Sequence, residues 1–342
     1  MSPEASPMIE TRITKMLGIQ HPIVMGGLTG AGTPELAAAV SNAGGLGMIA
    51  IHNAGSPEAG RVWIKKLRRL CQPNRPFGVN LTILPTMGPP PPYMEYANVI
   101  VEEGVKIVET AGSSPKQFVK FFRDAGLITI HKCVSIRHAL SAERYGVDII
   151  SLDGMECAGH PGEEDVGNFV LQAKGAKALT RPYLCSGGVG DGKQLAAALA
   201  LGADGVNCGT RFCATKECNW PESFKRRVME ANETDTVLML RRLNNTCRVF
   251  RNKVAEEVEE IESKKGDDFD FSDVAHLVSG KRGREAERNG DPDGGIWTAG
   301  QVIGLVDTIP TCAELVDTMM KEAVETIQGR LSSLVVGPRS RL

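Results

Sequence analysis

The chain has 342 residues, with 39 lysines and arginines against 41 aspartates and glutamates. This near balance excludes the basic surface that binds nucleic acid or an anionic membrane, so we expect small-molecule partners. No apolar run approaches the ~18 residues of a membrane span, no signal peptide opens the chain, and the nine cysteines lack zinc-type spacing. We therefore expect an intracellular protein without a metal site.

Apolar runs of strand length alternate with segments of helical spacing along most of the chain. The intervening segments carry helix signals, such as the cap at Thr33-Pro34 and the terminal glycine Gly146. Eight successive strand–helix units predict an α/β fold, a (β/α)8 TIM barrel over residues 11–218. The predicted strands cover 22–25, 46–51, 77–81, 105–108, 127–131, 147–152, 183–185 and 205–208.

The pattern changes after the eighth predicted strand. Residues 219–300 are charged and helical in pattern, without a strand-like run, and predict a helical lid subdomain inserted after strand eight. Residues 301–332 return to amphipathic helix, which we expect to pack on the barrel, and residues 333–342 are expected to form a mobile tail. The prolines at 89–92 predict a stiff loop over the barrel mouth.

The chain ends in Ser340-Arg341-Leu342, a variant of the Ser-Lys-Leu peroxisomal signal. In a eukaryote this ending predicts recognition by the peroxisomal import receptor. Otherwise the protein is expected in the cytoplasm.

A histidine in a glycine-rich loop follows the sixth predicted strand, where residues 153–162 read DGMECAGHPG. His160 exchanges protons near neutral pH, and the loops after barrel strands gather at one face of the barrel. We therefore predict that His160 transfers protons. The alternative is a histidine held by a backbone carbonyl in a structural loop.

Glycine turns follow the seventh and eighth predicted strands, at 186–188 and 207–210. Glycine lets the backbone approach a ligand closely, and the N–H groups of such turns bind phosphate. The two turns together predict a phosphate site, whereas a tight turn would explain either one alone.

Several motifs at these positions resemble the nitronate monooxygenase family, also called 2-nitropropane dioxygenases. They are PIVMGG at 22–27, NAGGLG at 42–47, FGVNL at 77–81, HKC at 131–133, ECAGHPG at 156–162, SGG at 186–188 and GTRF at 209–212. The fuller stretches CAGHPGE at 157–163, LVSGKRGR at 277–284 and GIWTAGQ at 295–301 are most similar to the NADH:quinone reductase branch. The resemblance extends from about residue 11 to residue 330 and implies an FMN-dependent oxidoreductase.

The resemblance also implies roles for individual residues. His160 and Lys132 would be catalytic, with Lys132 stabilising charge on the reduced flavin; a surface ion pair is the alternative for Lys132. Thr29 and Gly30 stand where relatives commonly have a glutamine and a bulky aromatic residue, which leaves the substrate open. The residues implied for FMN binding are Gly27, Leu28, Thr29, Asn80, Lys132, Asp153, Ala158, Gly159, Ser186, Gly187, Gly188, Gly209 and Thr210.

Three functions fit these residues. In the first, alkyl nitronates such as propionate 3-nitronate are oxidised with O2 through FMN. In the second, NAD(P)H reduces quinones through the same FMN, and in the third a cofactor-free barrel binds a phosphorylated metabolite. We rank nitronate oxidation first, because a peroxisomal ending suits an oxidase that produces peroxide.

For three features of the lid and of the assembly, the sequence allows more than one interpretation. The chain has no Rossmann fingerprint, so NAD(P)H would enter the barrel mouth directly, steered by Arg282 and Arg284, unless these arginines form a solvated helix face. Trp297 either closes over the flavin or packs the lid onto the barrel. The oligomeric state is undetermined, with a homodimer among the options.

Overall fold

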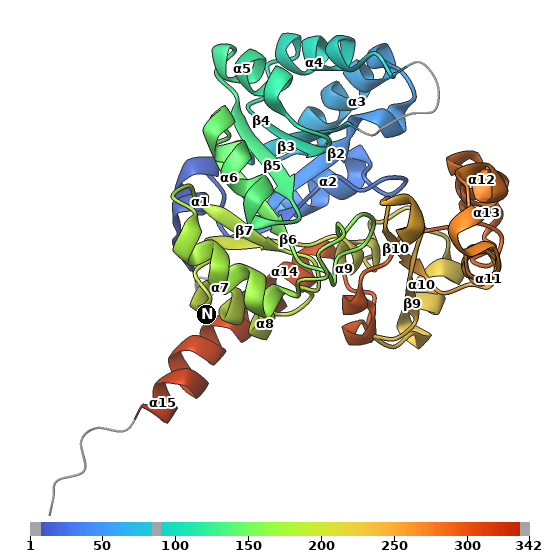
Figure 1. The fold of residues 1–342 in the computed structure, drawn as a ribbon. Coiled ribbons are helices and arrows are strands. Elements are labelled where there is room, and N and C mark those ends of the chain that lie inside the picture. The colour runs from blue at the N-terminus through green and yellow to red at the C-terminus, as the bar shows by residue number, and fades with distance from the viewer. Residues whose placement is uncertain (1–7, 84–89, 336–342) are drawn as a thin grey trace, which may run out of the picture.

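The computed structural model describes residues 8–83 and 90–335, and within them eight parallel strands form a closed barrel in sequence order (Figure 1). Pairing of β1 with β8 closes the barrel. The predicted TIM barrel is confirmed. The strands are β1 Ile23–Met25, β2 Leu46–Ala50, β3 Phe77–Ile83, β4 Ile107–Gly112, β5 Ile128–Cys133, β6 Ile149–Asp153, β7 Tyr183–Ser186 and β8 Gly205–Asn207.

Helices follow the strands around the outside of the barrel. Thr33 caps α2 by accepting a hydrogen bond from the Leu36 N–H, as its sequence predicted, and Gly146 ends α6 in a left-handed conformation. A short helix, α1 (Arg12–Leu17), precedes β1, and the 3-10 helix η1 (Ile51–Ala54) follows β2. The other helices of this layer are α2 Pro34–Asn42, α3 Pro57–Leu70, α4 Tyr93–Glu102, α5 Lys116–Asp124, α6 Ile136–Tyr145, α7 Asn168–Ala178, α8 Gly192–Ala200 and α9 Thr210–Cys213.

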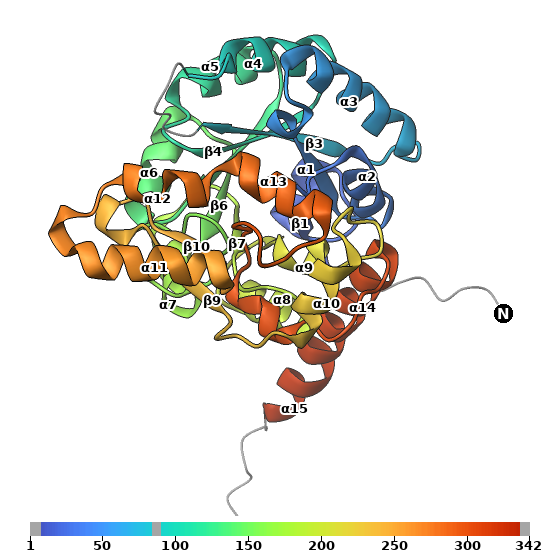
Figure 2. The same ribbon diagram turned by 90° about the vertical axis from the view of Figure 1, so that its right-hand side faces the viewer.

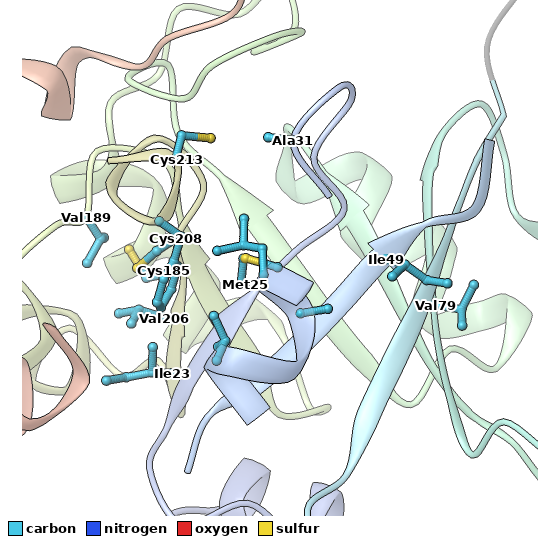
Figure 3. Packing of buried hydrophobic residues seen from close by; sticks show 14 of the residues in the cluster. Ile23, Met25, Ala31, Ile49, Val79, Cys185, Val189, Val206, Cys208 and Cys213 are labelled. Atoms are coloured by element: carbon cyan, nitrogen blue, oxygen red, sulfur yellow. The ribbon is translucent and has the colours of Figure 1, made fainter. Parts of the chain in front are cut away.

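The strands separate two apolar cores, because successive side chains of a strand point to opposite faces. Outward side chains such as Ile23, Ile49 and Val206 pack beneath the helices (Figure 3). Inward side chains fill the barrel together with Ile13 and Leu17 of α1, which close its amino-terminal end. The inward apolar set includes Val24, Met48, Ile107, Ile130, Ile149 and Leu184. Two residues further along β4, β5, β6 and β7, the inward positions are polar: Glu109, Lys132, Ser151 and Ser186.

The lid subdomain lies over one end of the barrel and has a core of its own (Figures 1 and 2). The prediction that it lacks strands is wrong, because β9 (Thr236–Met239) and β10 (Cys247–Phe250) pair as an antiparallel hairpin. Each strand has only four residues, and the buried Arg248 interrupts the apolar pattern of β10. The helices of the lid are α10 Glu222–Glu230, η2 Arg241–Leu243, α11 Lys253–Lys265, η3 Gly266–Asp268, α12 Phe271–Val278 and α13 Gly280–Asn289.

The chain then returns to the barrel wall. The segment expected to be helical from residue 301 begins with the 3-10 helix η4 (Gln301–Leu305), and the long helix α14 starts only at Cys312 and ends at Val324. The Glu322 carboxylate of α14 accepts a hydrogen bond from the Gly192 N–H at the start of α8, 2.9 Å away. A π-helical turn (Glu325–Leu331) and α15 (Ser332–Leu334) extend away from the body (Figure 1).

Two predictions fall on other parts of the chain. Residues 336–342, which carry the Ser-Arg-Leu ending, and residues 84–89, which include Pro89, lie outside the described residues. Of the described helices, none is long and apolar enough to cross a membrane.

Candidate functional site

A layer of polar side chains lies inside the barrel at the carboxyl ends of the strands. Its centre is Glu109 of β4, which is fully buried. The Glu109 carboxylate accepts hydrogen bonds from the Gly27 N–H at 2.9 Å, from the Asn80 amide at 2.8 Å and from the Asn207 amide at 3.1 Å. These three donors compensate the burial of the carboxylate and fix the ends of β1, β3 and β8 relative to one another.

The glycine pair after β1 is explained by this layer. A Cβ atom on Gly27 would lie 2.1 Å from the Asn80 side chain, and one on Gly26 would lie 2.8 Å from that of Asn207. Asn80, predicted as a flavin ligand, donates to Glu109 and accepts from the Thr82 hydroxyl at 2.8 Å. Its side chain thus packs against Gly27 and holds the Glu109 carboxylate that accepts the Gly27 N–H.

An ion pair occupies the neighbouring inward positions of β5 and β6. The Lys132 ammonium lies 3.1 Å from one Asp153 oxygen and 3.3 Å from the other, and 3.3 Å from the Ser186 hydroxyl. Burial by itself would lower the pKa of Lys132, but the charges of Asp153 and Glu109 outweigh it and raise the pKa above its ordinary value. Lys132 is thus a fixed cation at the barrel mouth, and the exposed ion pair considered as its alternative does not describe it.

His160 and this ion pair line one cavity of about 710 Å³. His160 is solvent-exposed at the rim of the cavity. The surrounding protein atoms nevertheless lower its pKa by desolvation, a shift opposed by Glu163 and Asn245. The lowered pKa favours the neutral imidazole, which is able to accept a proton. The other walls of the cavity include Ala158, Arg137, His138 and the lid residues Asn244 to Thr246.

The glycine turns after β7 and β8 present unused N–H groups. Within residues 8–83 and 90–335, the N–H groups of Gly187, Gly188 and Gly209 donate no hydrogen bond. The carbonyls of Gly187 and Gly188 are held from behind by the side-chain amides of Asn168 at 2.6 Å and Gln194 at 2.5 Å. Both of these glycines have φ values that favour glycine, 82° and 73°. These turns are thus held with their donors free, as an anion site requires.

A buried cation lies beside the glycine turns. The Arg211 guanidinium donates to the carbonyls of Ala214 and Thr308, and it forms no ion pair with a carboxylate of the described chain. A Cβ atom on Gly190 would lie 3.5 Å from the Arg211 side chain. The free N–H groups and this unpaired charge together fit a phosphate group. FMN carries such a group, so the residues at this end of the site fit it.

The remaining predicted residues have other structural roles as well. The Thr210 hydroxyl accepts the Gly300 N–H at 2.9 Å and ties the returning chain to β8, while the Gly159 backbone pairs with Arg248 of β10. Leu28 is half-buried and its carbonyl accepts the Asn53 amide at 2.9 Å, whereas Thr29 is exposed.

The contacts of Trp297, Arg282 and Arg284 decide between the alternative roles that the sequence allowed for these lid residues. Trp297 is buried and stacks on Phe250 of β10, with ring centroids 4.3 Å apart, and both rings belong to the same apolar cluster as the outward side chains of the barrel strands, so Trp297 packs the lid onto the barrel. Arg282 donates to the Gly294 carbonyl at 2.8 Å within the lid, whereas Arg284 is exposed. Only Arg284 is therefore free to meet a ligand.

Several members of the site were missed at the sequence level. Glu109 and Asn207 were visible as polar residues at strand ends, but nothing indicated that they share one hydrogen-bond network. Ser151, which accepts from Asn207 at 3.1 Å, was hidden in an apolar run. The contacts of Arg248 and Thr246 with the His160 loop had no sequence signal, because their hairpin was not predicted.

Comparison with known proteins places this geometry in a family. The model of the nitronate monooxygenase family matches residues 10–322. The chain belongs to the nitronate monooxygenase family. The resemblance of the strand-end motifs is thereby confirmed, and as a member of this family the protein is a flavin-dependent oxidoreductase.

Individual relatives within and around the nitronate monooxygenase family have different names. A Mycobacterium tuberculosis protein named (3aS,4S,5R,7aS)-5-hydroxy-7a-methyl-1-oxo-octahydro-1H-indene-4-carboxyl-CoA dehydrogenase is 27% identical, over 94% of this chain and 98% of its own. FabK from Thermotoga maritima superposes with a TM-score of 0.87 at 34% identity, over 96% of this chain and 100% of its own. Nitroalkane oxidase from Streptomyces ansochromogenes superposes with a TM-score of 0.79 at 26% identity, over 93% of this chain and 99% of its own.

Proposed function

We propose that the protein oxidises alkyl nitronates, such as propionate 3-nitronate, with O2 at an FMN bound across the barrel mouth. The observation that carries the proposal is that His160 and the Lys132–Asp153 ion pair line the same cavity. A group that takes up protons and a fixed positive charge therefore face one reaction volume. The family to which the chain belongs supports the reaction class.

FMN fits the two ends of this site. The free N–H groups of Gly187, Gly188 and Gly209 would hold its phosphate, with Arg211 supplying charge nearby. Lys132, whose ammonium lies 3.3 Å from the Ser186 hydroxyl beside these turns, would face its ring. When bound, FMN supplies the electron-accepting chemistry that protein side chains lack.

The side chains would perform the remaining tasks. With a nitroalkane, His160 would take the proton from the carbon beside the nitro group and so form the nitronate; with a nitronate, which has already lost that proton, it would hold a substrate oxygen by a hydrogen bond once the imidazole is protonated. Lys132 keeps its proton because Asp153 and Glu109 raise its pKa, so it would neutralise negative charge that develops beside it. Asp153 holds the ammonium in that position.

A second candidate function is a redox reaction of a coenzyme A thioester. It is favoured by the similarity to the Mycobacterium tuberculosis dehydrogenase and by the shape of the cavity, which continues from Lys132 to Arg137 on α6. Arg137 forms no ion pair with a described carboxylate, and it would be available to an anionic tail. NAD(P)H:quinone reduction on the same FMN is a third candidate function, and the experiment below includes it.

Anaerobic mixing separates these functions. The purified protein is mixed in turn with propionate 3-nitronate, NADH, NADPH and an acyl-CoA while the visible absorbance of its flavin is followed. We expect rapid bleaching with the nitronate. Bleaching by a nicotinamide or by the thioester, but not by the nitronate, would overturn the proposal. A colourless protein that cannot be reconstituted with FMN would contradict the flavin site itself.

A further inference from the structure

The loop that carries His160 lies along the lid hairpin as a partial third strand. The Gly159 N–H donates to the Arg248 carbonyl at 3.0 Å, and the Arg248 N–H donates to the Gly159 carbonyl at 2.6 Å. Among the described residues, 158–162 make no other backbone hydrogen bond. The backbone beside His160 is thus held by the lid and not by the barrel.

The Arg248 side chain strengthens this attachment. Arg248 is 4% exposed, and its guanidinium donates twice to the Met155 carbonyl, from Nε at 3.2 Å and from Nη2 at 3.1 Å. The third donor, Nη1, reaches the Thr236 hydroxyl of β9 at 2.9 Å. Since the fork geometry uses three donors at once, a lysine at this position could not reproduce it.

The charge of Arg248 is buried without a carboxylate partner in the described chain. Burying a cation is costly unless its donors are satisfied, and here two of them are spent on a single carbonyl of the His160 loop. The arrangement is therefore better suited to fixing that loop than to stabilising the lid.

Two further contacts join the same hairpin to the loop beyond His160. The Thr246 N–H donates to the Glu163 carboxylate at 3.0 Å, and the Thr246 hydroxyl donates to the other carboxylate oxygen. Arg241 pairs with Asp165, with Nη1 and Oδ1 3.1 Å apart. The loop is thus attached to the hairpin on both sides of His160.

We propose that Arg248 is a positioning residue that holds the His160 loop against the lid hairpin in its reactive arrangement. The inference rests on the proposed role of His160 and names a residue that acts through it. The barrel alone would hold the flavin, but turnover would require the hairpin.

The test combines local hydrogen exchange with kinetics on the flavin-loaded, full-length protein. We compare wild type, Arg248→Met, which removes all three donors, and Arg248→Lys, which keeps the charge. For Arg248→Met we expect protection of the Gly159 amide and kcat each to fall roughly tenfold, since hydrogen bonds to charged groups are lost, with KM and FMN affinity near wild type. Arg248→Lys is expected to restore both only in part.

Arg242→Ala is the matched control. Arg242 lies in the same hairpin but pairs with Asp267 inside the lid, at 3.0 Å, and its side chain does not reach the His160 loop. It should leave Gly159 protection and kcat unchanged. If Arg248→Met does not fold, Thr246→Val, which removes only the hydroxyl bonded to Glu163, replaces it and should weaken protection of residues 159–163 and kcat together.

Unchanged Gly159 protection in Arg248→Met, or a loss of protection with kcat unchanged, would overturn the positioning role. The exchange measurement does not require turnover, and kcat is measured with whichever compound bleaches the flavin. Failure of the nitronate proposal would therefore leave the test of Arg248 intact.

Discussion

The barrel and the lid hold the two halves of this site in different ways. In the barrel, Glu109, Asn80 and Asn207 are joined by buried hydrogen bonds between strands that are themselves paired in a closed sheet. The loop of His160 instead depends on a short hairpin. The comparison teaches that groups expected to hold a cofactor are built into the scaffold, whereas the proton-transfer group is placed by a separate subdomain.

The largest expected effect is on turnover, and it tests whether His160, which the lid holds in place, takes part in the reaction. Replacing His160 with asparagine should lower turnover of a nitroalkane, whose carbon must first lose a proton, by roughly 10²-fold or more, the contribution of a general base. FMN should remain bound, because the free N–H groups that fit its phosphate lie in the turns after β7 and β8, away from His160. Steady-state kinetics and the flavin absorbance check both parts. A turnover equal to wild type would reduce His160 to a structural residue.

The next effect tests the barrel half through acid stability. His131 is buried, with Nδ1 2.9 Å from the Thr110 hydroxyl, and desolvation lowers its pKa from 6.5 to about 4. Because the unfolded chain binds this proton more readily, the stability contribution is complete above pH 6.5 and is lost as the pH falls toward 4. The difference between the pKa of His131 in the unfolded and in the folded chain corresponds to about 3 kcal/mol in the free energy of unfolding.

Urea unfolding of wild type and His131→Phe between pH 7 and pH 4 measures this loss. The variant should lose less stability over the interval, and His276→Gln, which changes an exposed lid histidine, should behave as wild type. Parallel curves for wild type and His131→Phe would show that His131 does not control acid stability.

A third prediction concerns the glycine turn after β7. Gly187 has φ 82°, and a Cβ atom there would lie 2.5 Å from the Cys157 side chain. Gly187→Ala should therefore cost about 1–3 kcal/mol of stability and weaken FMN binding. Gly209→Ala is the matched control, since its φ is −114° and its nearest neighbour is 3.2 Å away. Equal effects of the two substitutions on thermal unfolding would argue against strain at Gly187.

The smallest effect concerns the outer contact between lid and loop. The Arg241–Asp165 pair has half-exposed side chains. Arg241→Ala should cost only about 0.2–1 kcal/mol, and less at high salt, because solvent and ions screen such pairs. Unfolding at low and at high salt measures the difference. A larger loss that does not depend on salt would mean that this pair is as important as the buried Arg248 contacts.

Much of the barrel could be predicted from the sequence, because buried parallel strands are continuous apolar runs of recognisable length. The predicted strands differ from the observed ones mainly at their ends, as for β4, which was expected at 105–108 and is found at Ile107–Gly112. Its last residues include Glu109 and Thr110, whose polarity disguised the strand. The same alternation of apolar and polar inward residues that builds the site thus obscured its edges.

The lid could be predicted only in outline. Strands of four residues, one of them containing a buried arginine, have no periodicity that distinguishes them from helix or loop. The contact of Arg248 with Gly159 depends on how lid and barrel meet in space. His160 was recognisable from its loop, but the residues that hold it were not.

Binding of the FMN phosphate by the glycine turns is tested most directly by fluorescence quenching, which compares the affinity of the flavin-free protein for FMN with its affinity for riboflavin. The free N–H groups of Gly187, Gly188 and Gly209 beside Arg211 would hold the phosphate, and charge-assisted hydrogen bonds of this kind should make FMN bind about 100-fold or more tightly than riboflavin. Equal affinities, or no binding of either flavin, would contradict this role of the glycine turns.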